Sequence, residues 1–438
     1  MVLVKRKMTE KLAQWMGKGD KRMPLIVHGA RQVGKTYTVR EFGLQHYRDM
    51  IYVNFETNVR LAAIFEENIS PQHIINHLEM FFGQRITPGE TLIFFDEVQV
   101  CERALTSLKY FCEDAPHYHV IAAGSLLGVA VNRTKYSFPV GKVDMLVQYP
   151  LDFEEFLWAC GQEILAGQIR RCYHSDTPLS EALHNLALEY YRFYMVVGGM
   201  PAAVNGYWAE KRLIDATAVH ALILNAYVAD MSKYASASEA TKIMACFNSI
   251  PAQLSKDNRK FQYKVVQKGG SATLFGASLD WLSAAGVIAK CNKIEHGYMP
   301  PAVYQSLSSF KVYMSDVGLL TTKSGLVAHD ILSGFKNSYV GALTENYVAN
   351  ALSVNGFSLY YWESDSIAKV DFVVQDYDKV VPIEVKADIH VKSRSLSVYM
   401  SKYDPPYALR ISAKNFGFVS KVKSVPLYAV FCIGEGVN

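Results

Sequence analysis

The stretch Gly29-Ala30-Arg31-Gln32-Val33-Gly34-Lys35-Thr36 decides the fold of the first part of the chain, because it is a complete GxxxxGK[ST] pattern. It directly follows the apolar run of residues 25–27, which predicts a strand, and it precedes a helix-compatible segment that extends to Phe42. Glycines let successive backbone N–H groups turn inward on phosphates, and the following helix adds the positive end of its dipole. This order of strand, loop and helix predicts a loop that binds a nucleoside triphosphate.

The residue types in this loop predict individual roles. All eight residues would surround the phosphates, Lys35 would reach the β and γ phosphates, and Thr36 would place its hydroxyl on Mg²⁺. The same letters can also occur by chance in a glycine-containing loop, but the flanking strand and helix argue against that origin. No motif for guanine recognition occurs in the first 150 residues, which favours ATP.

Two later strand ends supply candidate catalytic groups. The apolar run of residues 92–95 ends in Asp96 and Glu97, where the aspartate would complete the Mg²⁺ shell and the glutamate would orient or deprotonate the attacking water. A third run, residues 120–123, ends at Gly124 and Ser125, and the serine could act as a sensor of the γ phosphate. An ordinary strand-ending turn explains Ser125 almost equally well.

Composition sets the limits for the rest of the chain. Half of the 438 residues are apolar, charged residues make up 20%, and the formal net charge is +4. At about 150 residues per domain, this length predicts about three globular domains. The composition excludes a disordered chain and a strongly basic nucleic-acid coat, but it neither demands nor forbids a DNA or RNA partner.

The sequence contains no signal for a membrane or an oxidising compartment. The longest weakly polar stretch, near residues 120–131, falls well short of the about 20 residues that span a bilayer. Residues 8–22 are charged and polar where a signal peptide needs an apolar core. The seven cysteines are dispersed without a CxxC pair, which argues against a disulfide framework or a structural zinc site. We therefore expect no membrane partner and a cytoplasmic protein.

Several segments together resemble one known group, the AAA-type ATPases of bacteria and archaea whose C-terminal half is a family domain of unassigned function. The resemblance rests on the loop quoted above and on residues 94–99, 123–125, 149–156, 198–204 and 312–320, and so covers nearly the whole chain. Where that group has Gly-Arg before its Tyr-Pro-Leu motif, this chain has Gly141 and Lys142. Lysine supplies charge without the bidentate fork of arginine, which weakens the expectation that this position activates a neighbouring subunit of a homo-oligomer.

Pattern and resemblance together predict an α/β protein with four parts. Residues 1–155 are expected to form a P-loop AAA-type ATPase domain, and residues 156–235 a helical lid or connector. Residues 236–335 are expected to form a winged-helix-like domain, and residues 336–438 an α/β domain of the PD-(D/E)XK restriction-nuclease type.

The winged-helix prediction carries a nucleic-acid hypothesis. Residues 256–290 hold six basic residues against two acidic ones, a local excess of +4, and Lys264 and Lys268 would contact the phosphates of duplex DNA. Residues 386–423 hold eight basic residues against two acidic ones, an excess of +6 that could follow a phosphate backbone. Alternatively, the first segment serves only as a lid and protein contact, and the second is a solvated face.

Four residues near the C-terminus suggest a nuclease site. Residues 369–374 and 381–386 predict two strands, and a period of two places Glu384 and Lys386 on one face, where both can meet Asp371. Glu345, in a predicted helix, could join them. Three carboxylates would hold Mg²⁺, and the lysine would stabilise the attacking hydroxide. Alternating charge on an exposed strand is common, but the four residues together are similar to the PD-(D/E)XK arrangement.

Two functional hypotheses follow. In the first, the nucleotide site drives an ATP-dependent switch or motor that controls a DNA-binding or DNA-cutting C-terminal module. In the second, the protein is a slow ATP-dependent signalling or interaction protein whose C-terminal domain binds a partner without cleaving it. A small-molecule kinase is disfavoured, because Asp96 and Glu97 suit hydrolysis better than transfer to a bound acceptor.

Overall fold

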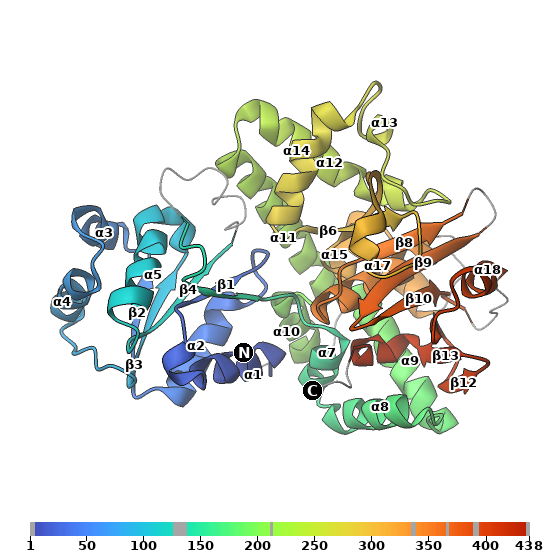
Figure 1. The fold of residues 1–438 in the computed structure, drawn as a ribbon, viewed down its shortest axis with the longest axis horizontal. Coiled ribbons are helices and arrows are strands. Elements are labelled where there is room, and N and C mark those ends of the chain that lie inside the picture. Colours follow the sequence, from blue (N-terminus) through green and yellow to red (C-terminus); the bar gives the residue numbers. More distant parts are fainter. Residues whose placement is uncertain are drawn as a thin grey trace. The chain divides into compact units, whose positions relative to one another are not determined.

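The computed structural model describes residues 5–125, 138–210, 213–333, 339–364, 368–388 and 394–434. Its contacts divide these residues into two compact units. The first unit holds residues 5–149 and 284–286, and the second holds residues 150–283 together with those from Val287 onward. Each unit contains its own β-sheet, so the two are described separately below (Figure 1).

The first unit is built on a parallel five-stranded sheet with the order β2-β3-β4-β1-β5. The strands predicted at residues 25–27, 92–95 and 120–123 are confirmed, and two further strands form the two edges of the sheet, one beside β3 and one beside β1. The strands are β1 (Leu25–His28), β2 (Asp49–Asn54), β3 (Thr91–Asp96), β4 (His119–Gly124) and β5 (Asp144–Val147).

Helices cover both faces of this sheet, because alternate strand residues point to opposite sides. Val27 and Phe94 pack with α1 and α2, whereas Ile26 and Phe95 pack on the other face with α3, α4 and α5 (Figure 1). The helix α4 begins with Pro71, directly after Ser70, whose side chain makes no capping hydrogen bond. The helices are α1 (Lys7–Met16), α2 (Lys35–His46), α3 (Ala62–Glu67), α4 (Pro71–Phe82) and α5 (Glu102–Asp114), with short 3₁₀ turns at Gly19–Lys21, Val59–Leu61 and Val98–Val100.

The second unit begins with the helical region that the sequence predicts. A tight turn between Val197 and Pro201 separates α9 from α10. A Cβ atom at Gly199 would lie 1.9 Å from the carbonyl oxygen of Leu151, and the Gly199 N–H donates to Asp316 Oδ2 at 2.6 Å. Only glycine fits such a close backbone approach. The helices here are α7 (Phe153–Ala159), α8 (Glu163–Ser175), α9 (Glu181–Val197), α10 (Pro201–Glu210), α11 (Leu213–Tyr234), α12 (Ala237–Leu254), α13 (Tyr263–Val266) and α14 (Ala272–Ala284).

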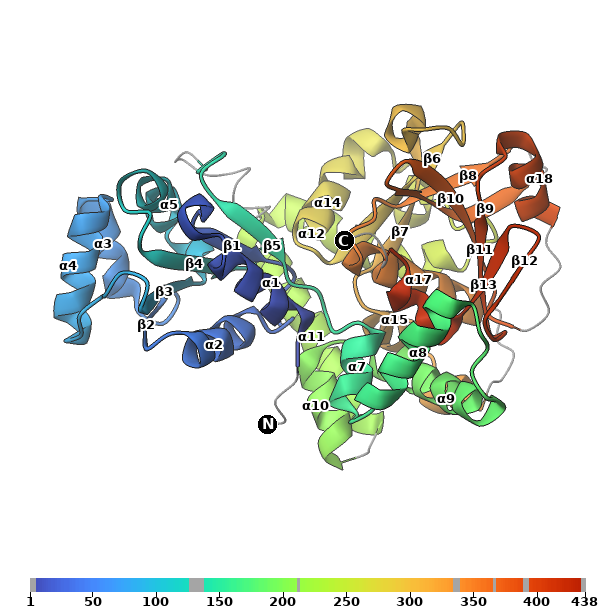
Figure 2. The same cartoon turned by 60° about the horizontal axis from the view of Figure 1, so that its bottom comes forward.

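An eight-stranded mixed sheet forms the remainder of the second unit, with the order β12-β13-β11-β10-β9-β8-β6-β7 (Figure 2). Its strands are β6 (Ile288–Ile294), β7 (Gln305–Met314), β8 (Tyr360–Glu363), β9 (Lys369–Asp376), β10 (Lys379–Val385), β11 (Ala408–Ser412), β12 (Gly417–Val419) and β13 (Val422–Pro426). The helices that accompany them are α15 (Val317–Lys323), α16 (Ala328–Leu332), α17 (Val340–Val354) and α18 (Arg394–Tyr403), with 3₁₀ turns at Pro301–Tyr304 and Leu427–Cys432.

This sheet crosses one of the predicted domain boundaries. The helices α12, α13 and α14 precede the β6–β7 hairpin along the chain, and β6 also pairs in parallel with β8 of the C-terminal segment. Residues 236–335 and 336–438 therefore contribute strands to one sheet. The predicted boundary between residues 335 and 336 does not separate two independent sheets. Within the described ranges, no helix combines the length and apolar character of a membrane span.

Candidate nucleotide site and C-terminal carboxylate cluster

The predicted phosphate loop connects β1 to α2. Gly29 has a φ of 146°, and a Cβ atom there would lie 2.1 Å from the carbonyl oxygen of Gln148, so this position requires glycine. The Lys35 side chain folds back over the loop and donates to the carbonyl oxygens of Gly29 at 3.0 Å and Ala30 at 2.8 Å. The ammonium group therefore already lies within the loop, held by neutral acceptors that a phosphate can replace.

Burial changes the protonation of this lysine. The Lys35 side chain is only 8% exposed, and its pKa is lowered to about 8 because burial disfavours the charged form. Nearby Glu97 and Asp96 oppose the shift, whereas Arg31 adds to it. His28, at the end of β1, has a lowered pKa for similar reasons, namely burial and then the charge on Lys35.

The two predicted metal ligands of this site are in direct contact. Thr36 Oγ1 donates to Asp96 Oδ2 at 2.8 Å, although the two residues are 60 positions apart in the sequence. Tyr52, from β2, donates to the same oxygen at 2.9 Å. A hydroxyl and a carboxylate side by side are a suitable oxygen donor set for Mg²⁺.

Glu97 occupies a special backbone position at the end of β3. Its φ is 52°, in the left-handed region that few residues other than glycine adopt. Its carboxylate accepts from Gln99 Nε2 at 2.5 Å, and its N–H donates to Asp96 Oδ1 at 3.0 Å. Asp96 and Glu97 thus each accept a hydrogen bond from a different group of the turn after β3.

One strand separates the two strands that carry these motifs. β3, which carries Asp96, is not adjacent to the P-loop strand β1, because β4 lies between them. Ser125 follows β4 directly and is 4% exposed, so the sheet places it at the carboxyl edge between the two motifs. In a parallel sheet this edge is where ligands bind.

Three residues that the sequence analysis missed support this site. Arg6 donates to the carbonyl oxygens of Val33 at 3.0 Å and Tyr149 at 2.6 Å, which fixes the P-loop from outside. The other two are Tyr52 and Gln99. Gln99 lies two residues after Glu97 and could have been suspected, whereas nothing in the sequence distinguishes Arg6 or Tyr52 from other polar residues.

Lys142, which replaces the arginine of the resembling group, has a partner in its own chain. Its Nζ lies 3.0 Å from Glu113 Oε1, and both side chains are exposed. The pair lowers the pKa of Glu113 and raises that of Lys142. An exposed ion pair of this kind contributes little to stability.

The C-terminal carboxylates lie in the second unit. β9 and β10 form the predicted hairpin, and Asp371 Oδ2 accepts from the backbone N–H of Val385 at 2.9 Å. Lys386 Nζ lies 3.5 Å from Glu384 Oε1, in agreement with the period-two prediction, and Arg410 donates to Glu384 Oε2 at 3.4 Å. These contacts bring three of the four predicted residues to one part of the sheet.

Glu345, the fourth residue, has a different environment. It is 1% exposed, and its carboxylate contacts Lys311 Nζ at 2.7 Å as well as Arg259 and the Tyr313 hydroxyl. Its charge is therefore neutralised by the protein itself. Within the described residues, the oxygens of Glu345, Asp371 and Glu384 do not form a group of three within 4.8 Å of one another. The three-carboxylate metal site is not assembled as the sequence suggested.

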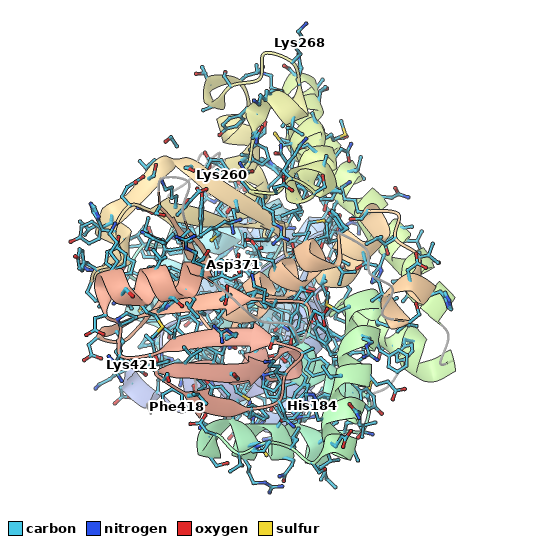
Figure 3. All side chains as sticks on the ribbon, turned by 90° about the vertical axis from the view of Figure 1, so that its right-hand side faces the viewer. His184, Lys260, Lys268, Asp371, Phe418 and Lys421 are labelled. Atoms are coloured by element: carbon cyan, nitrogen blue, oxygen red, sulfur yellow. The ribbon has the colours of Figure 1, made fainter. Side chains whose placement is uncertain are left out.

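Seven of the fourteen basic residues counted in the middle and C-terminal segments form ion pairs with described residues. Besides Arg259, Lys386 and Arg410, these are Lys260, Lys290, Lys421 and Lys423. Lys392 lies outside the described residues. Lys264 and Lys268, the predicted DNA contacts, are exposed and form no ion pair with a described residue. Figure 3 shows Lys268 at the outer tip of the helical part, away from the sheet that carries Asp371.

Comparisons with known proteins agree with the architecture of the first unit. Residues 21–157 match a family model described as an AAA domain. Two further matches cover residues 188–330 and 340–430, and both are described as domains of unknown function, DUF8612 and DUF4143. No curated protein matches the chain.

Several solved structures match the chain at low sequence identity and with TM-scores below 0.5. A Walker-type ATPase of Pyrococcus abyssi is 15% identical, with 73% of this chain and 96% of that chain covered and a TM-score of 0.45. The ORC1 protein of Aeropyrum pernix in complex with DNA is 13% identical, with 74% and 93% covered and a TM-score of 0.30. The AAA match, the parallel sheet and the loop after β1 together identify the first unit as a domain of the P-loop NTPase fold.

Proposed function

We propose that the first unit binds ATP with Mg²⁺ and hydrolyses it. The observation that carries the proposal is the direct hydrogen bond between Thr36 and Asp96, beside the buried ammonium of Lys35. A phosphate-binding loop, a cation and an oxygen donor pair for Mg²⁺ thus occupy one edge of a parallel sheet. These are the groups that positioning and charge stabilisation in phosphoryl transfer require.

Each residue has a role in this proposal. The N–H groups of the loop and Lys35 bind the β and γ phosphates, and Thr36 and Asp96 provide the oxygen ligands for the cation. Mg²⁺ neutralises the charge that develops on the phosphates. Glu97, held by Gln99, orients the attacking water and accepts its proton, and Ser125 contacts the γ phosphate or that water.

Replacement of the P-loop lysine tests this assignment. In Lys35→Ala we expect weaker ATP binding and a loss of turnover of about 10²–10³-fold, because a buried charge that stabilises the transferring phosphoryl group is removed. Lys109→Ala, an exposed lysine on α5 of the same unit, is the matched control and should leave both unchanged. Binding and turnover that are unaltered in Lys35→Ala would show that the phosphate site lies elsewhere.

For the second unit, we propose DNA binding through Lys264 and Lys268 and a metal-dependent cleavage site formed by Asp371, Glu384 and Lys386. The contact of Asp371 with the backbone between Glu384 and Lys386 supports this, because it keeps two carboxylates and a lysine together. Glu345 then has a structural role, not that of a metal ligand. The rival is a partner-binding unit without nuclease activity, and it is favoured by the neutralised Glu345.

Incubation with plasmid DNA distinguishes these two functions. Under the nuclease proposal, the wild-type protein with Mg²⁺ or Mn²⁺ cuts the plasmid, and Asp371→Ala and Lys386→Ala do not. Lys402→Ala, on α18 of the same unit, is the control for a general loss of positive charge. A wild-type protein that cuts nothing with either metal, with or without ATP, excludes the nuclease and leaves the rival.

A further inference from the structure

A second group of metal-binding side chains lies in the first unit, apart from the residues assigned to the nucleotide. Glu67, His73 and His77, here called the α3–α4 cluster, each offer a ligand atom, and these atoms all lie within 4.8 Å of one another. It is the only such group of three among the described residues. The cluster lies where α3 ends and α4 begins, two helices that neighbour each other over one face of the sheet (Figure 1).

The local fold builds this cluster from rigid parts. His73 and His77 are four residues apart on α4 and therefore lie on the same side of the helix. Their neighbours Ile74 and Leu78 are fully buried in the core, so the rotation of α4 about its axis is fixed. Three residues connect α3 to α4, which holds Glu67 beside the first turns of α4.

The hydrogen bond of the His77 ring leaves one of its nitrogen atoms available to a metal ion. His77 Nδ1 lies 2.8 Å from the carbonyl oxygen of His73, and because a carbonyl can only accept, Nδ1 carries the proton. The Nε2 atom of a neutral His77 then has a free lone pair. A histidine that ligates a metal commonly donates its other ring nitrogen in this way.

His73 supplies a second nitrogen atom that has no hydrogen-bond partner. Its Nε2 is buried and makes no hydrogen bond. Glu67 Oε2 lies 3.8 Å away, too far for a hydrogen bond but close enough for both atoms to contact one ion. A buried polar atom without a partner costs free energy, which an ion bound there would offset.

We propose that the α3–α4 cluster binds a divalent transition-metal ion, with Zn²⁺ as the representative. Two imidazole nitrogens and one carboxylate oxygen suit Zn²⁺ and related ions, whereas Mg²⁺ and Ca²⁺ prefer oxygen ligands throughout. Three protein ligands leave a fourth position for water. The bound ion joins the last residue of α3 to the start of α4 and so stabilises this part of the first unit.

Zinc titration of the full chain tests the proposal without any measurement of ATP turnover. The protein is stripped of metal with a chelator and titrated with Zn²⁺ in the absence of Mg²⁺ and nucleotide, against a competing chromogenic chelator. The wild type should bind one equivalent at this cluster. His73→Gln and His77→Gln should each lower the affinity for this zinc ion by at least about tenfold. The loss of a direct ligand lowers metal affinity at least as much as the loss of a residue that supports a ligand.

Two controls separate this cluster from other zinc ligands. His117→Gln, an exposed histidine of the same unit, should bind zinc like the wild type. Co²⁺ bound in place of zinc should give a spectrum without thiolate-to-metal charge transfer, because the cluster contains no cysteine. The proposal would be overturned if the wild type bound no zinc equivalent tightly, or if both variants bound zinc as tightly as the wild type. A thiolate-to-metal band in the cobalt spectrum would also overturn it.

Discussion

Lys35 and Lys311 are both buried lysines, but their partners differ in kind. Lys35, in the first unit, donates only to neutral carbonyl oxygens of its own loop. Lys311, in the second unit, contacts the carboxylate of Glu345, which Arg259 also contacts. The lysine of the binding site is thus held by neutral groups that a ligand can displace. A structural cluster, by contrast, neutralises its charge internally.

The same contrast holds for the carboxylates of the two regions. Asp96 accepts hydrogen bonds from the hydroxyl groups of Thr36 and Tyr52, so its negative charge remains available to a cation. Glu345 is surrounded by a lysine, an arginine and a tyrosine. A metal ion at Glu345 would have to displace two protein cations, whereas one at Asp96 would displace only neutral donors.

The largest expected effect is on the stability of the second unit. Glu345→Gln removes the carboxylate from two buried or partly buried cations, and a loss of about 3–5 kcal/mol in the free energy of unfolding is expected. Glu363→Gln, which affects a more exposed ion pair with Lys260, should cost less than about 1 kcal/mol. Urea unfolding measures both, while ATP binding reports separately on the first unit.

An equal cost for Glu345→Gln and Glu363→Gln would contradict the view that Glu345 belongs to a buried structural cluster. Loss of ATP binding at urea concentrations that unfold only the second unit would show that the two regions do not act separately.

The next effect is a pH dependence at Lys35. The charged form binds phosphate, and the pKa of this lysine in the free protein is about 8, so kcat/KM for ATP should fall as the pH rises through that value. The fall should reach at most about tenfold per pH unit, because a single proton is involved. Initial rates between about pH 7 and pH 9.5 measure it.

Lys35→Arg provides the control for this pH profile, because arginine stays protonated over the whole range. The variant should have a lower rate but a flat profile. If the fall near pH 8 persists in Lys35→Arg, another group causes it.

The smallest effect is expected at Lys142. The residue is exposed and paired with Glu113 of its own chain, so Lys142→Ala should change ATP turnover by less than about twofold. Turnover measured over a range of protein concentrations also tests for an effect between subunits. A loss of tenfold or more would mean that Lys142 acts on the nucleotide of a neighbouring subunit.

Sequence patterns predicted much of the first unit, because its strands, helices and phosphate loop depend on residues that are close together in the sequence. The strand before Gly29, the helix after Lys35 and the acidic end of β3 follow from apolar runs and loop composition. The insertion of β4 between β1 and β3 could not be predicted, because the pairing order of parallel strands depends on long-range packing. The two motifs meet although their strands are not adjacent.

In the second unit, the strands that carry the candidate residues were predicted more successfully than the contacts of those residues. The hairpin that holds Asp371 and Glu384 follows from alternation of residue types. The burial of Glu345 against Arg259 and Lys311 could not be predicted, because those cations come from segments more than 30 residues away. Arg259 is one of the six basic residues in the 256–290 segment, and in the structure it contacts Glu345.

The proposed role of Glu97 is that of the base for ATP hydrolysis, and the variant Glu97→Gln removes this base alone. The glutamine keeps the shape and removes the proton acceptor, so ATP binding should be retained while turnover falls by at least about 10²-fold. Glu90→Gln, at an exposed glutamate of the same unit, should behave like the wild type. If Glu97→Gln binds ATP and turns it over as fast as the wild type, Glu97 is not the base.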